Sequence, residues 1–276
     1  MTANDLTREG NTFIVDDSNK CEVRDGSIDI NVFISINVHD EYLLNELVKP
    51  GCVFVDAGAH MGAASIKAAS LGAKKIYGIE SLDINQEAFR KNVELNNYGD
   101  IITIVRKSMS TDDNGIYVTK NAYDNCYKLN TNEVYCLPGQ AVITEFSPDQ
   151  DKQGEKVFLE SISYKTLLSD YGIDRINVLK LDAEGGEYPF FSNAGELVDK
   201  IDIIVGEFHP HISGKEFTGL EYFELLKDYF CDITEDMFPL MTDEQRSWFS
   251  KLNNKKTLHL YILLNKRYKH FTDVYK

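Results

Sequence analysis

Several residue types are scarce in this 276-residue sequence, and each scarcity excludes a class of protein. Cysteine occurs five times, an odd number, and no two cysteines form a C-x-x-C pair. Neither a disulfide framework nor a cysteine-ligated zinc site is therefore expected. We expect free, mostly buried thiols in a reducing compartment, at Cys21, Cys52, Cys126, Cys136 and Cys231.

Long apolar runs are also missing. No run approaches the ~20 residues that a membrane-spanning helix requires. The N-terminal MTANDLTREGNTF is polar and lacks the apolar segment of a signal peptide. The sequence therefore predicts a cytoplasmic protein with no membrane partner.

Positive charge is in deficit, because 29 Lys and Arg residues face 44 Asp and Glu residues, for a formal net charge of −15. A surface this acidic repels phosphate backbones and anionic lipids. We therefore expect no nucleic-acid partner and no electrostatic docking on a membrane.

What is present is a globular composition, with 43% hydrophobic residues. From about residue 50, apolar strand-like runs alternate with helical segments, which is the pattern of a parallel sheet in an α/β fold. Short β-type runs precede this pattern, the last of them SIDINVFISI, and a β-prone segment rich in Tyr and Asn interrupts it. We predict one domain over residues 1–276, with an N-terminal β element and helix (1–49), a core (50–115 and 156–276) and an inserted flap (116–155).

The first core strand ends in VFVDAGAHMG, an apolar run followed by an acid and a glycine turn. Glycine allows the turn to approach a ligand closely, and the next helix offers free N–H groups. A dinucleotide-binding turn would read G-x-G-x-x-G, but the middle glycine is missing and Asp56 would repel a pyrophosphate. Asp56 suits the ammonium of an amino acid, whereas Glu80, at the end of the next strand, suits ribose hydroxyls. Together these groups describe S-adenosylmethionine.

Ligands of open α/β sheets bind beyond the carboxyl ends of the strands. The predicted cofactor contacts therefore lie at the ends of the first four core strands. They are Asp56, Gly58, Ala59, His60, Gly62, Glu80, Ser81, Ser108 and Asp182.

Four segments resemble the FkbM family of S-adenosylmethionine-dependent methyltransferases. They are KPGCVFVDAGAHMGAASIKAA, KKIYGIESLDINQEAFRKNVELNN, INVLKLDAEGGEYPFF and IDIIVGEFHP. The resemblance implies a Rossmann-like, seven-stranded class I methyltransferase sheet with helices on both faces. It also implies cofactor contacts at Asp56, Gly58 and Glu80, and O-methylation of a hydroxyl on a glycan or a secondary metabolite.

Methyl transfer to a hydroxyl needs a base or a metal ion, since a sugar hydroxyl is a poor nucleophile until it loses its proton. His209 is the base expected from its usual pKa, and Asp182 or Glu207 would orient it or act instead. Alternatively, Asp182, Glu184 and Glu207 would hold Mg²⁺. One of Glu184 and Glu187 would instead bind the amides of the next helix.

Two other functions stay open on sequence grounds. The first is a nicotinamide-dependent oxidoreductase, which the missing middle glycine disfavours. The second is a binding domain that has kept the fold and lost the chemistry, which the acids at several strand ends disfavour.

Overall fold

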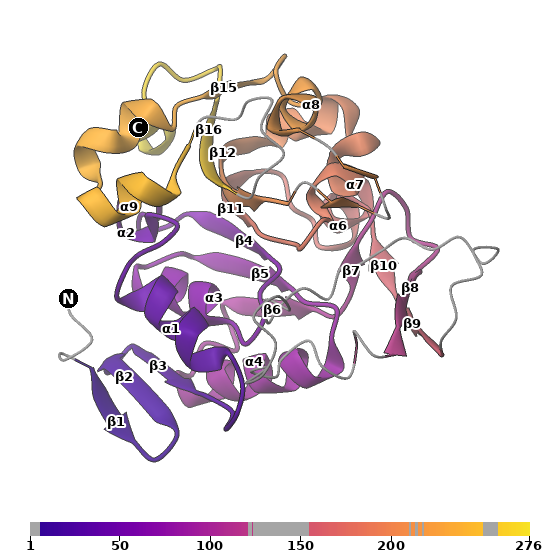
Figure 1. The fold of residues 1–276 in the computed structure, drawn as a ribbon. Coiled ribbons are helices and arrows are strands. Elements are labelled where there is room, and N and C mark those ends of the chain that lie inside the picture. Colours follow the sequence, from indigo (N-terminus) through magenta and orange to yellow (C-terminus); the bar gives the residue numbers. More distant parts are fainter. Residues whose placement is uncertain are drawn as a thin grey trace.

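The computed structural model describes residues 6–120, 123, 155–209, 211–212, 215–216, 218–250 and 259–276. The central feature is a seven-stranded sheet in the order β15-β16-β12-β11-β4-β5-β6 (Figure 1). Its strands are β4 (Val53–Ala57), β5 (Lys75–Ile79), β6 (Ile102–Val105), β11 (Ile176–Leu181), β12 (Ile201–Phe208), β15 (Phe230–Asp232) and β16 (His259–Asn265). The sheet confirms the predicted α/β class and the predicted number of strands.

The strand order reverses between β4 and β11. From β4 the chain runs outward through β5 and β6, then returns to place β11 on the other side of β4. The pairs among β6, β5, β4, β11 and β12 are parallel, whereas β16 is antiparallel to both of its neighbours. The carboxyl ends of β4 and β11 therefore form a topological switch point, where such sheets bind ligands.

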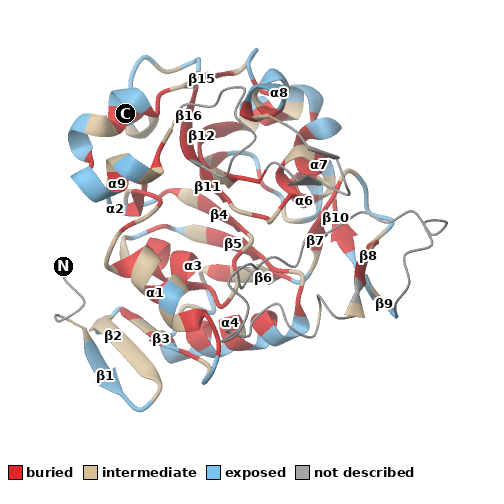
Figure 2. Cartoon of the chain, in the orientation of Figure 1, coloured by how far each residue is buried: buried red, intermediate tan, exposed pale blue. Residues whose placement is uncertain are grey.

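The core strands are apolar on both faces because both faces are covered. Phe54 of β4 and Val178 of β11 pack into the core cluster on one face of the sheet. Their chain neighbours Val55 and Leu179 pack into the cluster on the other face. All four are fully buried, and Figure 2 shows buried residues running along the central strands.

Helices cover both faces, as predicted. Residues of α1, α3 and α4 contribute to the first core cluster, and residues of α6, α7 and α8 contribute to the second. The helices and 3-10 helices are α1 (Asp29–Asn37), α2 (Leu44–Leu47), α3 (Ala63–Ser70), α4 (Asp83–Leu95), α6 (Tyr164–Asp170), α7 (Glu187–Ser192), η2 (Gly195–Lys200), α8 (Gly219–Glu224), η3 (Glu235–Leu240), α9 (Asp243–Trp248) and η4 (Phe271–Tyr275).

The N-terminal region differs from its prediction. A three-stranded antiparallel sheet of β1 (Thr7–Glu9), β2 (Thr12–Asp16) and β3 (Asn19–Glu22) is present. The run SIDINVFISI, however, forms helix α1 and not a strand. Phe33 and Ile36 of this run are both buried, and a spacing of three places them on one helical face. Directly before the core, only the four residues of α2 are helical.

The predicted insertion begins with β8 (Ile116–Thr119), which pairs antiparallel with β9 (Lys156–Leu159). The ribbon therefore extends past residue 155, into the segment predicted as core. Most of the predicted flap, including the aromatic residues Tyr127, Tyr135 and Phe146, lies outside the described residues. The third core strand ends at Val105, earlier than expected, and Ser108 belongs to the short strand β7 (Ser108–Met109). Strand β7 pairs with β10 (Ser161–Ile162), and β13 (His211–Ile212) pairs with β14 (Lys215–Glu216).

No helix in the described residues is long and apolar enough to cross a membrane. Three of the five cysteines, Cys21, Cys52 and Cys231, are described, and all three are free thiols. Cys126 and Cys136 lie outside the described residues.

Candidate functional site

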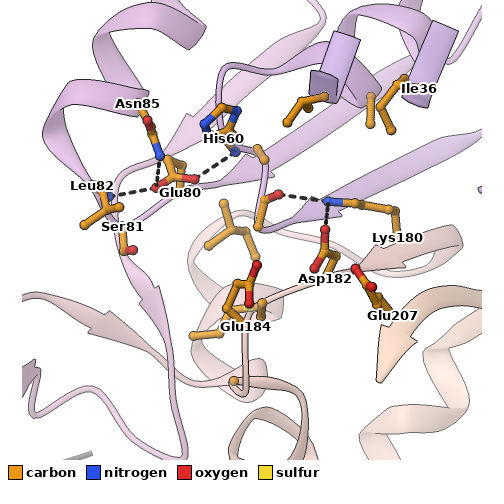
Figure 3. A pocket seen from close by; sticks show the side chains of 18 of the residues that line it. Ile36, His60, Glu80, Ser81, Leu82, Asn85, Lys180, Asp182, Glu184 and Glu207 are labelled. Atoms are coloured by element: carbon orange, nitrogen blue, oxygen red, sulfur yellow. Dashed lines mark hydrogen bonds and ion pairs between the residues drawn. The ribbon is translucent and has the colours of Figure 1, made fainter. Parts of the chain in front are cut away.

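A cavity of about 310 Å³ lies over the carboxyl ends of the parallel strands. It is lined by the turns after β4, β5 and β11, by Glu207 near the end of β12, and by residues of helix α1, of which Figure 3 labels Ile36. Its volume falls at the lower end of the ~300–1,000 Å³ typical of small-molecule sites. Sequence reasoning missed the α1 wall, which includes Asn31, Val32, Ser35 and Ile36, because this run was expected to be a strand.

The turn after β4 needs glycine at position 58. Gly58 has φ 79°, and a Cβ on it would lie 1.7 Å from the carbonyl oxygen of Asp182. The turn therefore packs directly on the end of β11, and Gly58 lines the cavity. Gly62 does not line the cavity; a Cβ there would lie 2.0 Å from the ring of Phe89. Gly62 thus lets the start of α3 pack against α4, and its predicted contact with the cofactor stays a prediction.

Asp56 also differs from its predicted role. Its side chain is fully buried below the turn and does not line the cavity. Ser65 Oγ donates a 2.7 Å hydrogen bond to Asp56 Oδ2, and the ammonium of Lys180 lies 3.3 Å from Oδ1. The acid does attract a cation, as its position suggested, but that cation is a lysine of this chain.

Lys180 connects the two halves of the site, and sequence reasoning assigned it no role. Its Nζ donates a 2.8 Å hydrogen bond to the carbonyl of Gly58 and lies 3.6 Å from Asp182 Oδ2. Burial alone would lower the pKa of Lys180, but Asp56 and Asp182 raise it above its usual value. A signal was available, because a lysine inside the apolar run INVLKL must be buried and therefore needs an acidic partner.

Glu80 lines the cavity at the end of β5, as predicted. Its carboxylate accepts hydrogen bonds from the backbone N–H groups of His60 (2.8 Å) and Leu82 (2.9 Å). Burial raises the pKa of Glu80 to about 6. The predicted contacts Ala59 and Ser81 lie beside it on the cavity wall.

Two buried polar atoms on the wall have no hydrogen-bond partner among the described residues. They are Oγ of Ser108 and Nδ1 of His60. Leaving such an atom unpaired costs roughly 1–3 kcal/mol, so both are suited to a polar ligand. Burial lowers the pKa of His60 to about 4, which keeps its imidazole neutral. We call this part of the cavity, around His60, Glu80 and Ser108, the cofactor end.

The other part of the cavity, which we call the acidic end, is lined by Glu41, Asp182, Glu184 and Glu207. Tyr42 Oη donates a 2.8 Å hydrogen bond to Asp182 Oδ2, whereas Asp182 Oδ1 is buried without a hydrogen-bond partner in the described residues. Burial raises the pKa of Glu184 and that of Glu207 to about 8. The backbone of Glu184 is strained, because its φ of 51° lies in the left-handed region that few residues other than glycine adopt.

His209 lies just behind the acidic end and does not line the cavity. Its Nδ1 is 2.9 Å from Glu187 Oε1, and its Nε2 is 3.3 Å from Glu184 Oε2. Burial alone would lower the pKa of His209, but Glu187 and Glu184 raise it well above 6.5. These carboxylates favour the protonated form of the imidazole. His209 thus lies behind the wall of the cavity, and its role as general base stays a prediction.

Glu187 binds backbone amides, as expected of one of the two loop acids, but these amides belong to the loop before α7 and not to the helix. Its carboxylate accepts hydrogen bonds from the backbone N–H groups of Ala183 (2.9 Å) and Gly185 (3.1 Å). It is almost completely buried. Glu187 therefore organises the loop before α7, while Glu184 faces the cavity.

The acidic end could also hold a metal ion. One ligand atom each from Asp182, Glu207 and His209 lie within 4.8 Å of one another. This set differs from the predicted one, because it contains His209 in place of Glu184.

Comparison with known protein families gives a match over most of the chain. The model of the family described as "Methyltransferase FkbM domain" matches residues 56–245. The matched residues contain the turn after β4 and all the acids of the strand ends. The α1 wall of the cavity lies before them.

Among curated relatives, a ribosomal protein L11 methyltransferase of Syntrophomonas wolfei is 39% identical over 61 residues, which is 22% of this chain and 20% of the relative. A protein of the same name from Anoxybacillus flavithermus is 35% identical over 66 residues, 24% of this chain and 21% of the relative. The match thus spans about a fifth of the length of these relatives.

Solved structures that align with this chain include a putative rRNA-methylase from Clostridium thermocellum. The two sequences are 12% identical, the alignment covers 88% of this chain and 97% of that chain, and the TM-score is 0.43. A putative methyltransferase from Streptococcus mutans, solved with S-adenosylhomocysteine, has 9% identity, 88% and 99% coverage and a TM-score of 0.41.

Proposed function

The chain belongs to the FkbM methyltransferase family, and from that premise we propose that it is an S-adenosylmethionine-dependent O-methyltransferase. Its acceptor would be a hydroxyl group of a saccharide or secondary metabolite. The supporting observation is that one cavity joins the cofactor end to the acidic end (Figure 3). A bound cofactor and an acceptor would meet inside it.

The cofactor end fits S-adenosylmethionine in three ways. The turn at Gly58 brings backbone close to the ligand, and Glu80 lies where a ribose hydroxyl would donate to its carboxylate. Ser108 and His60 each offer an unpaired buried polar atom. Because Asp56 is occupied by Lys180, the ammonium of the methionine part would bind to other groups of the cavity wall.

S-adenosylmethionine, when bound, supplies a methyl group on a sulfonium sulfur. Transfer would break the bond between the methyl carbon and sulfur, leave its electron pair on sulfur and form a bond from the methyl carbon to the acceptor oxygen. The chain aligns the two reactants, which contributes on the order of 7–11 kcal/mol to catalysis. It must also take the acceptor proton. Glu184 is placed for this step, because it lines the cavity and its side chain is 32% exposed, which allows the proton to reach solvent. Since its pKa is raised to about 8, the ionised form that accepts the proton increases as the pH rises toward and above 8.

The acidic end supports an acceptor without phosphate groups. Asp182, Glu184 and Glu207 would repel a nucleic-acid backbone at the point of transfer. The ribosomal protein methyltransferases match over too short a segment to indicate a protein acceptor. Hydroxyl groups of a neutral acceptor would instead donate hydrogen bonds to these carboxylates.

The test has two parts. Calorimetry should show that the wild-type protein binds S-adenosylhomocysteine and does not bind NAD. Incubation with methyl-labelled cofactor should then label a member of a saccharide and secondary-metabolite panel, with RNA and ribosomal protein as comparison acceptors. Binding of NAD alone would favour the oxidoreductase; labelling only of RNA or protein would show the acceptor class to be wrong. Cofactor binding with no transfer to any acceptor would indicate a non-catalytic domain.

A further inference from the structure

We propose that the acidic end binds a divalent first-row transition-metal ion through Asp182, Glu207 and His209. That the ion also activates the acceptor rests on the proposed function; that it binds does not. This differs from the Mg²⁺ site expected from sequence, because the ligands include an imidazole.

The spacing of the three groups suits one ion. His209 Nε2 lies 3.8 Å from Asp182 Oδ1 and 3.9 Å from Glu207 Oε2. Metal bonds to nitrogen and oxygen are about 2.0–2.2 Å long, so two ligands of one ion lie on the order of 3–4 Å apart. The observed separations therefore need little adjustment to surround an ion.

The environment of His209 is the second, independent observation. The residue is 9% exposed, and Nδ1 is held by the buried carboxylate of Glu187. Nε2 faces three carboxylates, with Glu184 Oε2 at 3.3 Å, Asp182 Oδ1 at 3.8 Å and Glu207 Oε2 at 3.9 Å. A ligand histidine is typically fixed in this way, with its second nitrogen bound to a carboxylate. Glu187 is anchored in turn by two backbone N–H groups of its loop.

The third observation is a carboxylate oxygen without a hydrogen bond in the described residues. Asp182 Oδ1 is buried and accepts no hydrogen bond in the described part of the chain. The nearby ammonium of Lys180 is already engaged by Asp56 and by the carbonyl of Gly58. A bound cation would satisfy Asp182 Oδ1 and compensate the excess of negative charge.

The donor set selects the kind of ion. Mg²⁺ takes oxygen ligands in near-ideal octahedral geometry. Carboxylates suit Mn²⁺, and imidazole suits the later first-row metals. Two carboxylates with one imidazole therefore favour Mn²⁺, Fe²⁺ or Zn²⁺ over Mg²⁺.

An ion at this position would make the acceptor hydroxyl more acidic by withdrawing electron density from its oxygen. The O–H proton would pass to the ionised carboxylate of Glu184, and the oxygen lone pair would form the new bond to the methyl carbon. The C–S electron pair leaves with the sulfur, so the step needs no oxidant or reductant.

Mn²⁺ binding, measured by the loss of the free-ion electron paramagnetic resonance signal, tests the proposal directly. The wild-type protein should bind Mn²⁺, and an equal concentration of Mg²⁺ should displace little of it. Glu187→Gln, which alters the group positioning His209, should weaken binding roughly 10–100-fold. His209→Ala and Glu207→Gln should weaken it further. The exposed acid Glu196 provides a control, because Glu196→Gln changes the same charge far from the ligands and should bind as the wild type does.

Affinity for S-adenosylhomocysteine, measured on the same samples, separates loss of metal binding from misfolding. It should stay at the wild-type level in the variants, since the cofactor end is unchanged. The proposal is wrong if the wild type binds no Mn²⁺, if folded His209→Ala binds it equally well, or if Mg²⁺ displaces it fully. It is also wrong if no ion binds but an amino sugar stabilises the wild type and not Glu207→Gln, which would indicate an ammonium site.

Activity assays then distinguish the two proposals. Metal binding without methyl transfer to any acceptor would support the site and contradict the proposed function. Unchanged methyl transfer after removal of metal by a chelator would support the function and contradict metal activation of the acceptor.

Discussion

The two ends of the cavity are built in different ways. The cofactor end consists of short turns directly after β4 and β5, with a neutral His60 and one acid, Glu80, bound by nearby backbone N–H groups. The acidic end gathers charged side chains from the segment after α1, the loop after β11 and strand β12. Asp182, for example, accepts a hydrogen bond from Tyr42, which is 140 positions away in the sequence. Local structure therefore dominates one end and long-range charge pairing the other.

The largest effect should come from removing the cation between the two ends. Lys180→Met leaves Asp56 buried and unpaired, which we expect to cost about 3–5 kcal/mol of the free energy of unfolding. Urea denaturation measures this loss. The double variant Asp56→Asn with Lys180→Met should recover part of the lost stability, because it no longer buries an unpaired carboxylate. A Lys180→Met protein as stable as the wild type would show that Asp56 is not held by this pair.

A smaller loss of stability is expected at Gly58, where the backbone of the turn after β4 packs on the backbone of Asp182. Gly58→Ala adds a Cβ that would lie 1.7 Å from the Asp182 carbonyl at a φ of 79°. We expect about 2–4 kcal/mol of destabilisation, with weaker binding of S-adenosylhomocysteine. Gly99→Ala is the matched control, since a Cβ there meets nothing within 4 Å and should change stability little. Equal stability of the two variants would contradict this packing.

The cofactor end alone is tested by Glu80→Gln. A charged acceptor forms stronger hydrogen bonds than a neutral one, so we expect affinity for S-adenosylhomocysteine to fall roughly tenfold. Glu94→Gln, on the exposed side of α4, should leave the affinity unchanged. Calorimetry compares the two. An unaltered affinity in Glu80→Gln would remove Glu80 from the cofactor site.

The smallest effect concerns pH. Because burial raises the pKa of Glu80 to about 6, the folded state holds this proton more tightly than the unfolded chain does. Lowering the pH through 6 therefore increases the contribution of Glu80 to the free energy of unfolding. The same change protonates the Glu80 carboxylate, which would accept the hydrogen bond from the ribose. Between pH 7.5 and 5.5 the affinity for S-adenosylhomocysteine should fall about fourfold more in the wild type than in Glu80→Gln. Parallel pH profiles would contradict this assignment.

Much of the cofactor end was predictable because it depends on short-range rules. The apolar run before Asp56, the glycine turn and the acid after β5 each follow from residues close in sequence, and they placed Gly58, Ala59, His60, Glu80 and Ser81 on the cavity. The structure added what depends on tertiary packing. Gly62 packs on Phe89, and helix α1 forms a wall where a strand was expected.

The sequence by itself determined the alternation of strands and helices, hence the α/β class, the strand-end acids and the resemblance to the methyltransferase family. Only the tertiary structure decided which charges are paired. Lys180 is paired with Asp56, and the carboxylates of Glu187 and Glu184 raise the pKa of His209. The physical reason is that burial and charge act through space: a pKa depends on the groups within a few ångströms, and those groups come from strands far apart in the chain.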